Sequence, residues 1–335
     1  MATSPISWND KYVSATGTEP WATNSAANPS SLSVALANAV AGDRVWIKGG
    51  SYTLTSPTMA ADGTGDAPIV WIGYDSTTSA PADWPSEIMP RDFGGTGPLN
   101  TTNFPIITVQ TTALIVTGDM NIMMGLSFVG SIAADDIVEI QSTALGSGLY
   151  RCRVEQQSTT TTNQTRCVSL GATSSFLIDC DAKTSAAGWY STSSNGVVYQ
   201  SSSASLPVVY CRFEINNTTT ASRGKGPSLR WISVGNLFYG GARGSFLMAL
   251  SGGMVHIGNT IYGGGELNVR GFYSNFNFGG SSFFLDNHVT DCDVGWSNGA
   301  GSPNSFWAVF NTRTRDNTTE VSGNADLGLE KVAGN

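Results

Sequence analysis

The chain has 335 residues, of which 40% are hydrophobic and only 13% are charged, and its net charge is -8. Globular proteins usually contain about 25% charged residues, so this surface depends on uncharged polar side chains. The acidic balance, without a basic stripe, argues against nucleic acid as a partner. No apolar stretch reaches the roughly 18 residues that a membrane helix needs, so we expect no membrane insertion.

The first third of the chain predicts an extension, a capping helix and the first strands. Residues 1–30 are polar, show no signal-peptide pattern and are expected to form an extension or attachment segment. Leu32, Leu36 and Val40 then recur every four residues, which indicates a short helix with one apolar face. Such a helix would cover the open end of a stack of strands. Residues 67–74 are typical of a strand in an early coil.

A five-residue pattern repeats through the rest of the chain: apolar, any residue, usually Cys or Asn, any residue, apolar. Its central residues lie at positions 126, 152, 180, 211, 236, 259, 287 and 311, so successive copies are about 26 residues apart. Apolar residues at a period of two predict a strand with one buried face. A spacing of this size suits one circuit of short strands and turns, and the repeats therefore predict a solenoid over residues 31–315.

Stacked circuits would place the central residues above one another in one inward column. This expected structural ladder consists of Cys152, Cys180, Cys211, Asn236, Asn259, Asn287 and Asn311. Its cysteines would act as small apolar side chains, and its asparagine amides would hydrogen-bond to their neighbours. We prefer a ladder to a catalytic role because stacked polar columns stabilise sheets. The odd number of cysteines favours free thiols, and no Cys or His spacing indicates a metal site or a cofactor.

The repeats, the helix and the Gly42-Asp43 pair that follows it resemble the pectate-lyase-like superfamily. The resemblance implies an all-β fold, a single-stranded right-handed parallel β-helix with a short N-terminal capping helix. Residues 316–335 are then expected to form a C-terminal tail or cap. The superfamily includes lyases, hydrolases, esterases, phage tailspikes and non-enzymatic adhesins, so the fold alone leaves the activity open.

The resemblance also implies where chemistry would lie if the protein is an enzyme. Lyases of the superfamily use an Arg or Lys base and acidic calcium ligands on the outer face of a sheet. Its hydrolases use clustered Asp residues with Gly-His-Gly and Arg-Ile-Lys motifs, and this sequence contains neither motif. Arg223, Lys225 and Arg230 are weak candidates for a lyase base, although a polar loop explains the same residues.

One group of charged residues is interpreted as structural. Asp179 and Asp181 are expected to face outward on one strand, where neighbouring circuits carry Arg151, Arg153 and Arg212. Opposite charges on adjacent strands stabilise a sheet as a surface charge ladder. These arginines would neutralise both carboxylates, which leaves neither free to hold calcium.

Other titratable residues also receive structural interpretations. The acidic residues within 135–139 fit no calcium-loop signature and are expected in a solvated turn. His256 is expected to point outward from a strand. Asp286 and His288 share an outward face and could pair a general base with its orienter. A solvent-facing pair is preferred because no third catalytic group is identifiable beside them.

Aromatic residues in or near turns are the candidates for ligand binding. They are Trp189, Tyr190, Tyr239, Tyr262, Tyr273 and Trp296. Exposed aromatic rings on a long acidic surface suit stacking against glycans or contacts with another protein. The alternative, that these rings pack loops against the side of the coil, is equally consistent with the sequence.

The main functional expectation is a non-enzymatic phage virion protein, such as a decoration, head-fibre or tail-associated protein. It would be made in the host cytoplasm, lie on the virion surface, and bind other virion proteins, itself as a homotrimer, or surface polysaccharide. The alternative is a polysaccharide lyase or hydrolase, which includes tailspike depolymerases and would also fit a secreted protein. A third reading is an adhesin or stalk module.

Overall fold

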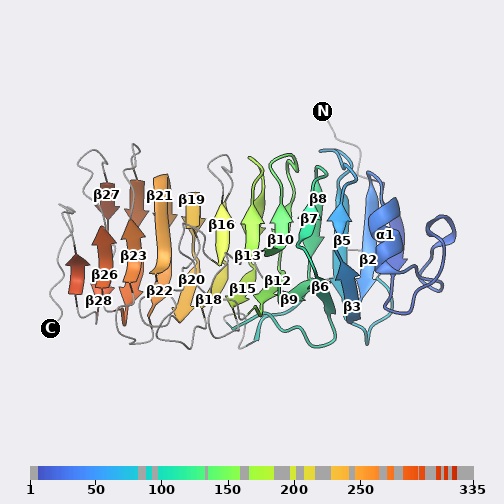
Figure 1. Ribbon diagram of the computed structural model, residues 1–335, viewed down its shortest axis with the longest axis horizontal. Coiled ribbons are helices and arrows are strands. Elements are labelled where there is room, and N and C mark those ends of the chain that lie inside the picture. Colours follow the sequence, from blue (N-terminus) through green and yellow to red (C-terminus); the bar gives the residue numbers. More distant parts are fainter. Residues whose placement is uncertain are drawn as a thin grey trace.

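The computed structural model forms one coil of short strands that runs along the long axis of the molecule (Figure 1). It describes residues 7–81, 88–92, 97–132, 135–158, 166–184, 197–200, 207–215, 228–240, 246–263, 270–274, 282–292, 294–298, 307–310, 313–315 and 319–322. Each named strand pairs in parallel with its counterparts in the neighbouring circuits. The expected fold class, an all-β parallel β-helix with an N-terminal helix, is confirmed.

Three rows of strands run along the coil, and one row is a separate ten-stranded sheet. Its strands are β3 (Gly50–Thr55), β6 (Pro105–Gln110), β9 (Ser127–Gly130), β12 (Arg153–Gln156), β15 (Asp181–Thr184), β18 (Arg212–Ile215), β20 (Leu237–Gly240), β22 (Thr260–Tyr262), β25 (His288–Thr290) and β28 (Arg313–Arg315). From β9 onward each strand begins in register with the one before it, so side chains stack in straight columns.

The other two rows together form a 19-stranded sheet. The first row contains β1 (Asn9–Val13), β2 (Asp43–Lys48), β5 (Ile69–Tyr74), β8 (Asn121–Met124), β11 (Gly148–Tyr150), β14 (Phe176–Ile178), β17 (Val208–Val209), β24 (Ser282–Leu285) and β27 (Trp307–Phe310). The second contains β4 (Thr58–Met59), β7 (Leu114–Val116), β10 (Asp136–Ile140), β13 (Arg166–Leu170), β16 (Val198–Gln200), β23 (Arg270–Ser274), β26 (Val294–Asn298) and β29 (Thr319–Ser322). The long strands β19 (Ser228–Val234) and β21 (Phe246–Ile257) pair with both rows and join them.

A sharp corner connects the first row to the ten-stranded sheet in successive circuits. The corner residue has a positive φ of 48 to 64° at Gly125, Arg151, Asp179, Tyr210, Gly235, Gly258 and Asp286. Glycine adopts this left-handed conformation readily, whereas most other residues do so at a cost. Each five-residue repeat therefore spans two short strands that meet at a corner, and the single strand expected from its alternation is wrong.

A continuous core fills the space between the three rows. The inward column of the ten-stranded sheet is fully buried and consists of Ile107, Phe128, Val154, Ala182, Phe213, Phe238, Ile261 and Val289. Within it the rings of Phe213 and Phe238 stack with their centroids 5.1 Å apart. Each circuit repeats the contacts of its neighbours, as in other solenoids, so the core extends along the coil without a break.

The outer face of the first row is also apolar, although it is only partly buried. Its outward column includes Met124, Tyr150, Ile178, Val209, Val234, Ile257 and Leu285, aligned strand by strand. The ten-stranded sheet instead carries charged and aromatic residues on its outer face. The two outer faces therefore differ in chemistry, and only the second resembles a site for polar ligands.

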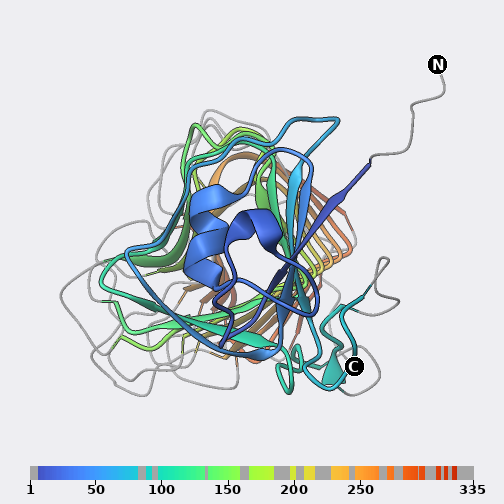
Figure 2. The same ribbon diagram turned by 90° about the vertical axis from the view of Figure 1, so that its right-hand side faces the viewer.

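The N-terminal end of the coil is covered by helix α1 (Leu32–Asn38), which lies across the open end in Figure 2. Ser31 caps this helix, because its Oγ accepts a hydrogen bond from the Val34 amide at 3.3 Å. Leu32 and Ala35 form its buried face, while Val40 lies beyond the helix and is 58% exposed. The expected contribution of Val40 to that face is wrong.

The stack of strands begins before the helix. Strand β1 pairs in parallel with β2, so residues 9–13 belong to the coil although we expected an extension as far as residue 30. The short 3-10 helix η1 (Trp21–Thr23) follows it. Within the described residues, no helix is long and apolar enough to cross a membrane.

Candidate ligand-binding face

The outer face of the ten-stranded sheet carries two columns of outward side chains from neighbouring strands. The first contains Ser127, Arg153, Asp181, Arg212, Leu237, Thr260 and His288. The second contains Val129, Glu155, Lys183, Glu214, Tyr239, Tyr262 and Thr290. Side chains two apart on a strand share a face, so the sequence alternation alone creates this two-column arrangement.

Charges alternate in both columns over β12, β15 and β18. Arg153 and Glu155 of β12 form an ion pair at 3.0 Å. Lys183 of β15 lies 3.5 Å from Glu214 of β18, which also lies 3.9 Å from Arg212. Neighbouring strands therefore present opposite charges to one another, which stabilises their pairing.

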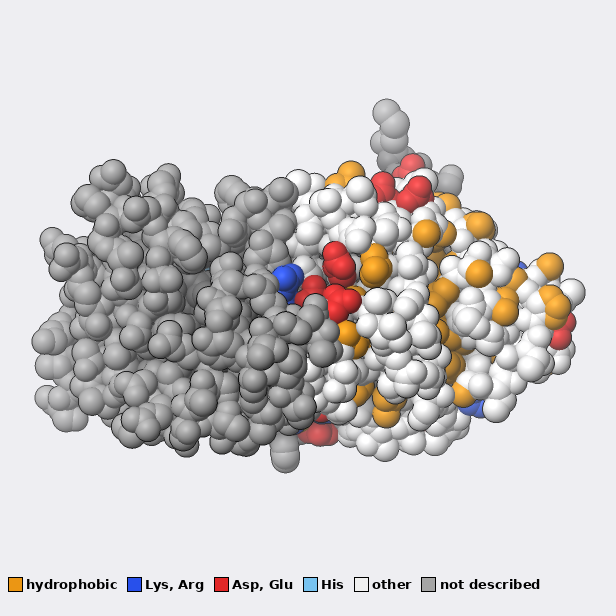
Figure 3. Space-filling model, in the orientation of Figure 1, with side chains coloured by type: hydrophobic (Ala, Val, Ile, Leu, Met, Phe, Trp, Pro, Cys, Tyr) orange, Lys and Arg blue, Asp and Glu red, His pale blue; other side chains and the backbone are white. Residues whose placement is uncertain are grey.

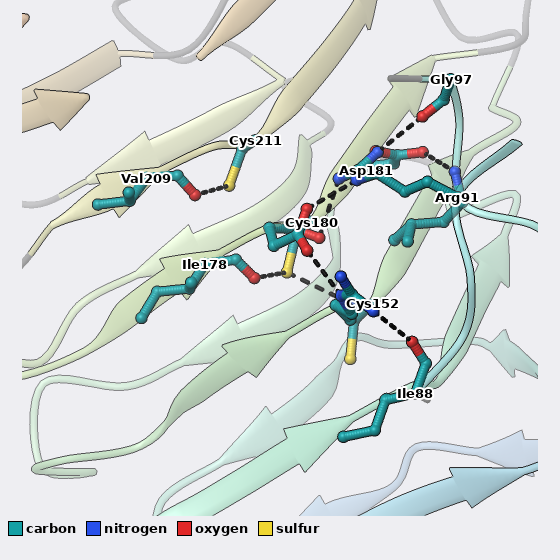
Figure 4. A network of polar contacts seen from close by, with 12 residues as sticks. Ile88, Arg91, Gly97, Cys152, Ile178, Cys180, Asp181, Val209 and Cys211 are labelled. Carbon is teal, nitrogen blue, oxygen red and sulfur yellow. Dashed lines mark hydrogen bonds and ion pairs between the residues drawn. The ribbon is translucent and has the colours of Figure 1, made fainter. Parts of the chain in front are cut away.

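A segment from an earlier circuit covers part of this charged area. Residues 88–92 and 97–104, which we call the strap, lie between β5 and β6 and outside the coil (Figure 2). Arg91 of the strap donates hydrogen bonds of 2.7 Å to Asp179 and to Asp181. The Leu99 amide donates to the second oxygen of Asp181 at 2.6 Å. Figure 4 shows the Arg91 side chain directed toward Asp181.

The contacts of Arg91 make the strap part of the fold. Its side chain is only 8% exposed and that of Asp181 only 6%. Burial raises the pKa of Asp181, although the positive charge of Arg91 and the Leu99 amide oppose that effect. Arg151 completes the cluster with a 2.7 Å contact to Asp179 and a hydrogen bond to the Ile88 carbonyl. Neither carboxylate is free for chemistry.

This cluster differs from the charge ladder expected from the sequence. Asp179 is a corner residue with a φ of 52°, so it does not share a strand with Asp181. Arg151 does contact Asp179, but the closest carboxylates to Arg153 and Arg212 are glutamates. Sequence reasoning missed Arg91 altogether, since its partners are 88 and 90 residues away.

Aromatic residues replace the charges in the next two circuits. The rings of Tyr239 and Tyr262 stack with centroids 5.4 Å apart and an interplanar angle of 6°. The Arg212 guanidinium lies 5.6 Å from the Tyr239 ring centroid, within the range of a cation–π contact. Tyr210, at the corner before β18, is 61% exposed, and Tyr239 is 39% exposed. We call Tyr210, Arg212, Tyr239 and Tyr262 the tyrosine strip.

Two corners beside the tyrosine strip are glycines, so no side chain projects from them. A Cβ added to Gly235 would lie 2.6 Å from the Tyr210 ring, so this ring rests directly against the glycine backbone. A Cβ added to Gly258 would meet nothing within 4 Å. The two corners after Tyr210 are therefore glycines, Gly235 under the Tyr210 ring and Gly258 without a covering side chain among the described residues. The next corner is the exposed residue Asp286.

The far end of the tyrosine strip is acidic. Tyr262 is hydrogen-bonded to Asp291, and that hydrogen bond and the negative charge raise the pKa of the Tyr262 phenol. His288 lies next to Thr260 in the first outward column, and Asp286 is exposed at the corner before it. This end of the strip therefore combines a phenol with carboxylates.

Several expected site residues lie outside what the structure describes. Arg223, Lys225, Trp189, Tyr190 and Asn311 are outside the described residues. The backbones of Arg230, Tyr273 and Trp296 lie in β19, β23 and β26, and their side chains are not described. The weak lyase candidates therefore stay predictions, and Tyr239 and Tyr262 are the two expected aromatic residues whose side chains are described.

The ladder residues share one inward position after each corner. Cys180 Sγ accepts a hydrogen bond from the Cys152 amide, and Asn236 Oδ1 accepts one from the Cys211 amide. The thiols of Cys152, Cys180 and Cys211 are free and buried, and burial raises the pKa of Cys152 to about 12. In Figure 4 the cysteine sulfurs point away from Arg91 into the coil.

The asparagines of the ladder bond to one another. Asn236 Nδ2 donates to Asn259 Oδ1 at 3.1 Å, and Asn259 Nδ2 donates to Asn287 Oδ1 at 2.9 Å. Asn287 Nδ2 donates to the His256 carbonyl at 3.0 Å. All three side chains are buried, and each amide has partners within the coil. This arrangement is structural, because buried amides need such partners.

Two titratable residues lie deeper than expected. His256 is 1% exposed and stacks against Phe284 at 4.9 Å, so the outward orientation expected for it is wrong. Asp136 is 6% exposed at the start of β10 and contacts Arg166 at 3.4 Å, so it does not lie in a solvated turn. Among the described residues, no group of three or more His, Cys, Asp or Glu side chains is placed to hold a metal ion.

The surface view agrees with a coil of low charge density. On the face shown in Figure 3, the described part has mostly uncharged side chains, with acidic and basic residues gathered in a few small groups. The acidic groups outnumber the basic ones on this face, consistent with the net charge of -8.

Comparisons with known proteins find similarity in fold only. No protein-family model and no curated protein matches the sequence. Among solved structures, a rhamnogalacturonan lyase matches with a TM-score of 0.47 and 12% identity over 92% of this chain and 87% of its own.

Two further solved structures are similar to a comparable extent. A mannuronic-acid-specific polysaccharide family 6 lyase from human gut microbiota matches with a TM-score of 0.45 and 15% identity over 86% of this chain and 73% of its own. A pectate lyase matches with a TM-score of 0.40 and 14% identity over 93% of this chain and 80% of its own. Such distant likeness describes the fold and leaves function to the residues themselves.

Proposed function

We propose that the protein is polysaccharide-active and that it holds an extended glycan along the tyrosine strip. The observation that carries the proposal is the stack of Arg212, Tyr239 and Tyr262 on the outer face of the ten-stranded sheet, beside exposed Tyr210. Exposed aromatic rings with a polar hydroxyl offer both an apolar surface and a hydrogen-bonding group. Sugar rings present the same combination, with apolar C–H faces and peripheral hydroxyls.

The strip is prepared for binding before a ligand arrives. Stacking between Tyr239 and Tyr262 and the contact with Arg212 restrict the rotation of these side chains. Ordering flexible side chains at an interface costs about 0.5–1.5 kcal/mol each, so restricted rings bind with a smaller loss of entropy. The Tyr210 ring is likewise supported by Gly235.

The geometry of the coil favours a polymer over a small molecule. Neighbouring parallel strands are about 4.8 Å apart, so the face repeats at that interval along the coil. A glycan chain repeats at a similar interval, which lets successive sugars meet successive circuits. Among the described residues, no metal-binding cluster is present that would instead suit a compact metal-bound ligand.

Cleavage of the glycan is a separate question from its binding. The weak base candidates Arg223, Lys225 and Arg230 stay predictions, because their side chains are not described. A polysaccharide-binding coil also fits the expected virion surface protein, alone or as a homotrimer, as well as a secreted protein. Binding is therefore the first property to measure.

The experiment is affinity electrophoresis through gels that contain a panel of neutral and acidic polysaccharides. Tyr210→Ala and Tyr239→Ala should abolish the retardation of the wild-type protein by its ligand. Leu145→Ala is the matched control, since Leu145 is 44% exposed but outside the strip. Equal retardation of all variants would remove the strip from the binding site, and no retardation on any polysaccharide would contradict the proposed function.

The same panel separates binding from cleavage. Reducing-end release reports any cleavage, and ultraviolet absorbance of an unsaturated product distinguishes elimination from hydrolysis. Absorbance that disappears in Arg223→Ala, Lys225→Ala or Arg230→Ala would identify a lyase.

A further inference from the structure

We infer that the polysaccharide held by the tyrosine strip is uncharged, rather than a polymer of uronic acids; this inference rests on the proposed function. A uronate polymer carries one carboxylate on each acidic sugar. To bind it tightly, a protein must offer cationic groups that are not already neutralised by its own carboxylates.

The cations on the described outer face of the ten-stranded sheet already have carboxylate partners. Glu214 lies 3.5 Å from Lys183 and 3.9 Å from Arg212, so one carboxylate faces both cations that border the strip. Arg153 has its own partner, Glu155, at 3.0 Å. Recruiting any of these cations for a ligand would require breaking an existing pair.

The strap cluster pairs two further arginines with carboxylates. Arg91 is 8% exposed and is held by two aspartates. Arg151 bonds to Asp179 and to the Ile88 carbonyl of the strap. These contacts cover Asp181 on the outer side of β15, whereas Lys183 of the same strand is 27% exposed and pairs with Glu214 of β18.

The opposite end of the open surface repels anions. Asp291 accepts the hydrogen bond of Tyr262, and Asp286 is exposed at the next corner. Among the described residues around the strip, Glu214, Asp286 and Asp291 carry negative charge, and Lys183 and Arg212 carry positive charge. Like charges about 4 Å apart cost about 1 kcal/mol each even in water, which disfavours a polymer with repeated carboxylates.

An uncharged ligand also limits the chemistry. β-Elimination of a glycosidic bond starts with removal of the proton next to a sugar carboxylate, and a neutral sugar has no such activated proton. β-Elimination is thus closed to a glycan without carboxyl groups, whereas hydrolysis, in which water adds across the glycosidic bond, needs no such proton. Beyond the strip, Arg313 of β28 pairs in register with His288, and Arg315 pairs with Thr290.

The test compares polymers that differ only in charge. Uronate polymers and the same polymers after chemical reduction of their carboxyl groups are offered to the full-length protein, and binding is measured by titration calorimetry at low and high salt. We expect at least tenfold tighter binding of a reduced polymer, little change with salt, and loss of binding in Tyr239→Ala. Exposed charge contacts are screened by salt, whereas neutral contacts are not.

Tighter binding of the uronate form that still depends on Tyr239 would overturn the inference while the proposed function stands. If that binding disappears in Arg313→Ala/Arg315→Ala, the cations of β28 are responsible. Absence of binding to every polymer, neutral or charged, would overturn both.

A gain-of-function variant tests the charge argument directly. Glu214→Gln releases Lys183 and Arg212 from their shared carboxylate and should strengthen uronate binding at least fivefold. Glu19→Gln makes the same change in net charge away from the sheet face and should leave binding unchanged. Equal effects of the two variants would overturn the inference that self-neutralised cations exclude acidic glycans.

Discussion

Arg91 Nη1 lies 2.7 Å from the Asp181 carboxylate, and the two residues are 90 positions apart in the chain. This contact fixes the strap on the outer face of the coil. The pair is almost fully buried, so its loss leaves a charge without a partner in a low-dielectric environment.

Arg91→Ala should lower the free energy of unfolding by about 3–5 kcal/mol, because Asp181 would then be buried without its cation. Arg153→Ala removes a more exposed ion pair and should cost no more than about 1 kcal/mol. Chemical denaturation of both variants measures the difference. Similar small losses would show that the strap is not anchored by Arg91.

Asn259→Leu should lower the free energy of unfolding by about 3 kcal/mol or more. The substitution removes Asn259 Oδ1, which accepts hydrogen bonds from the Asn236 backbone amide and the Ser233 hydroxyl inside the coil. Each buried polar group left without a partner costs about 1–3 kcal/mol. Thr260→Ala, at the exposed neighbouring position, should change stability by less than about 0.5 kcal/mol. A small effect at Asn259 would contradict the ladder.

Gly235→Ala and Gly258→Ala test the support of Tyr210. Both glycines have a φ of 62°, so alanine should cost a similar backbone strain at each, about 1 kcal/mol. Only at Gly235 does the added methyl collide with the Tyr210 ring, and Gly235→Ala should cost more. When Tyr210 is also replaced by alanine, the additional loss of stability at Gly235 should vanish. An excess that persists would show that the ring does not rest on Gly235.

Acid should destabilise the protein through His256. Burial lowers the pKa of His256 to about 3 in the folded protein, whereas the unfolded chain takes up this proton near pH 6.5. The unfolded state thus binds more protons in this window, and stability falls as the pH falls, by about 1.4 kcal/mol per unit. His256→Phe should remove this slope, as denaturation at several pH values would show.

Asp136 should make the stability depend on pH in the opposite direction. Burial raises its pKa to about 7 in the folded protein, from an ordinary value of 3.8. The folded state then holds the extra proton, so stability falls as the pH rises through this window. The two slopes oppose each other between about pH 4 and 6.5, where the wild type should vary little. In Asp136→Asn, the loss of stability at low pH that His256 causes should become measurable. Parallel curves of stability against pH for the wild type, Asp136→Asn and His256→Phe would refute this account.

Self-association, expected from the sequence as a homotrimer, would use the apolar outer face of the first row. Val209 lies on this face, aligned between Ile178 and Val234. Val209→Lys should convert an oligomer into a monomer in analytical ultracentrifugation, because lysine opposes burial. Thr53→Lys, at an exposed position of β3, is the control. A wild type that stays monomeric at all concentrations would contradict the expectation.

The repeated columns of the coil could be read from the sequence because they recur at a regular interval. The ladder positions and the core of the ten-stranded sheet follow from the same alternation. The alternation could not predict that the His256 side chain points inward. Its neighbours Val255 and Ile257 are apolar although they lie on the outer face. The corners carried a signal in Gly235-Asn236 and Gly258-Asn259, where glycine permits a positive φ.

The candidate site was only partly foreseen. Tyr239 and Tyr262 were selected as aromatic residues near turns, but their stacking depends on register, which the sequence spacing of 23 residues does not fix by itself. Tyr210 was read as a member of a strand, and only its corner conformation exposes the ring. Arg91 belongs to a segment without periodicity, so no local pattern indicates its contact with Asp181.

The most direct test of the central claim is a crystal structure of the protein with an oligosaccharide fragment of the polymer it binds. We predict that the sugar chain lies along the coil on the outer face of β18, β20 and β22, in contact with Tyr210 and Tyr239. A ligand bound instead on the first-row face, or on the strap side of Arg91, would contradict the account.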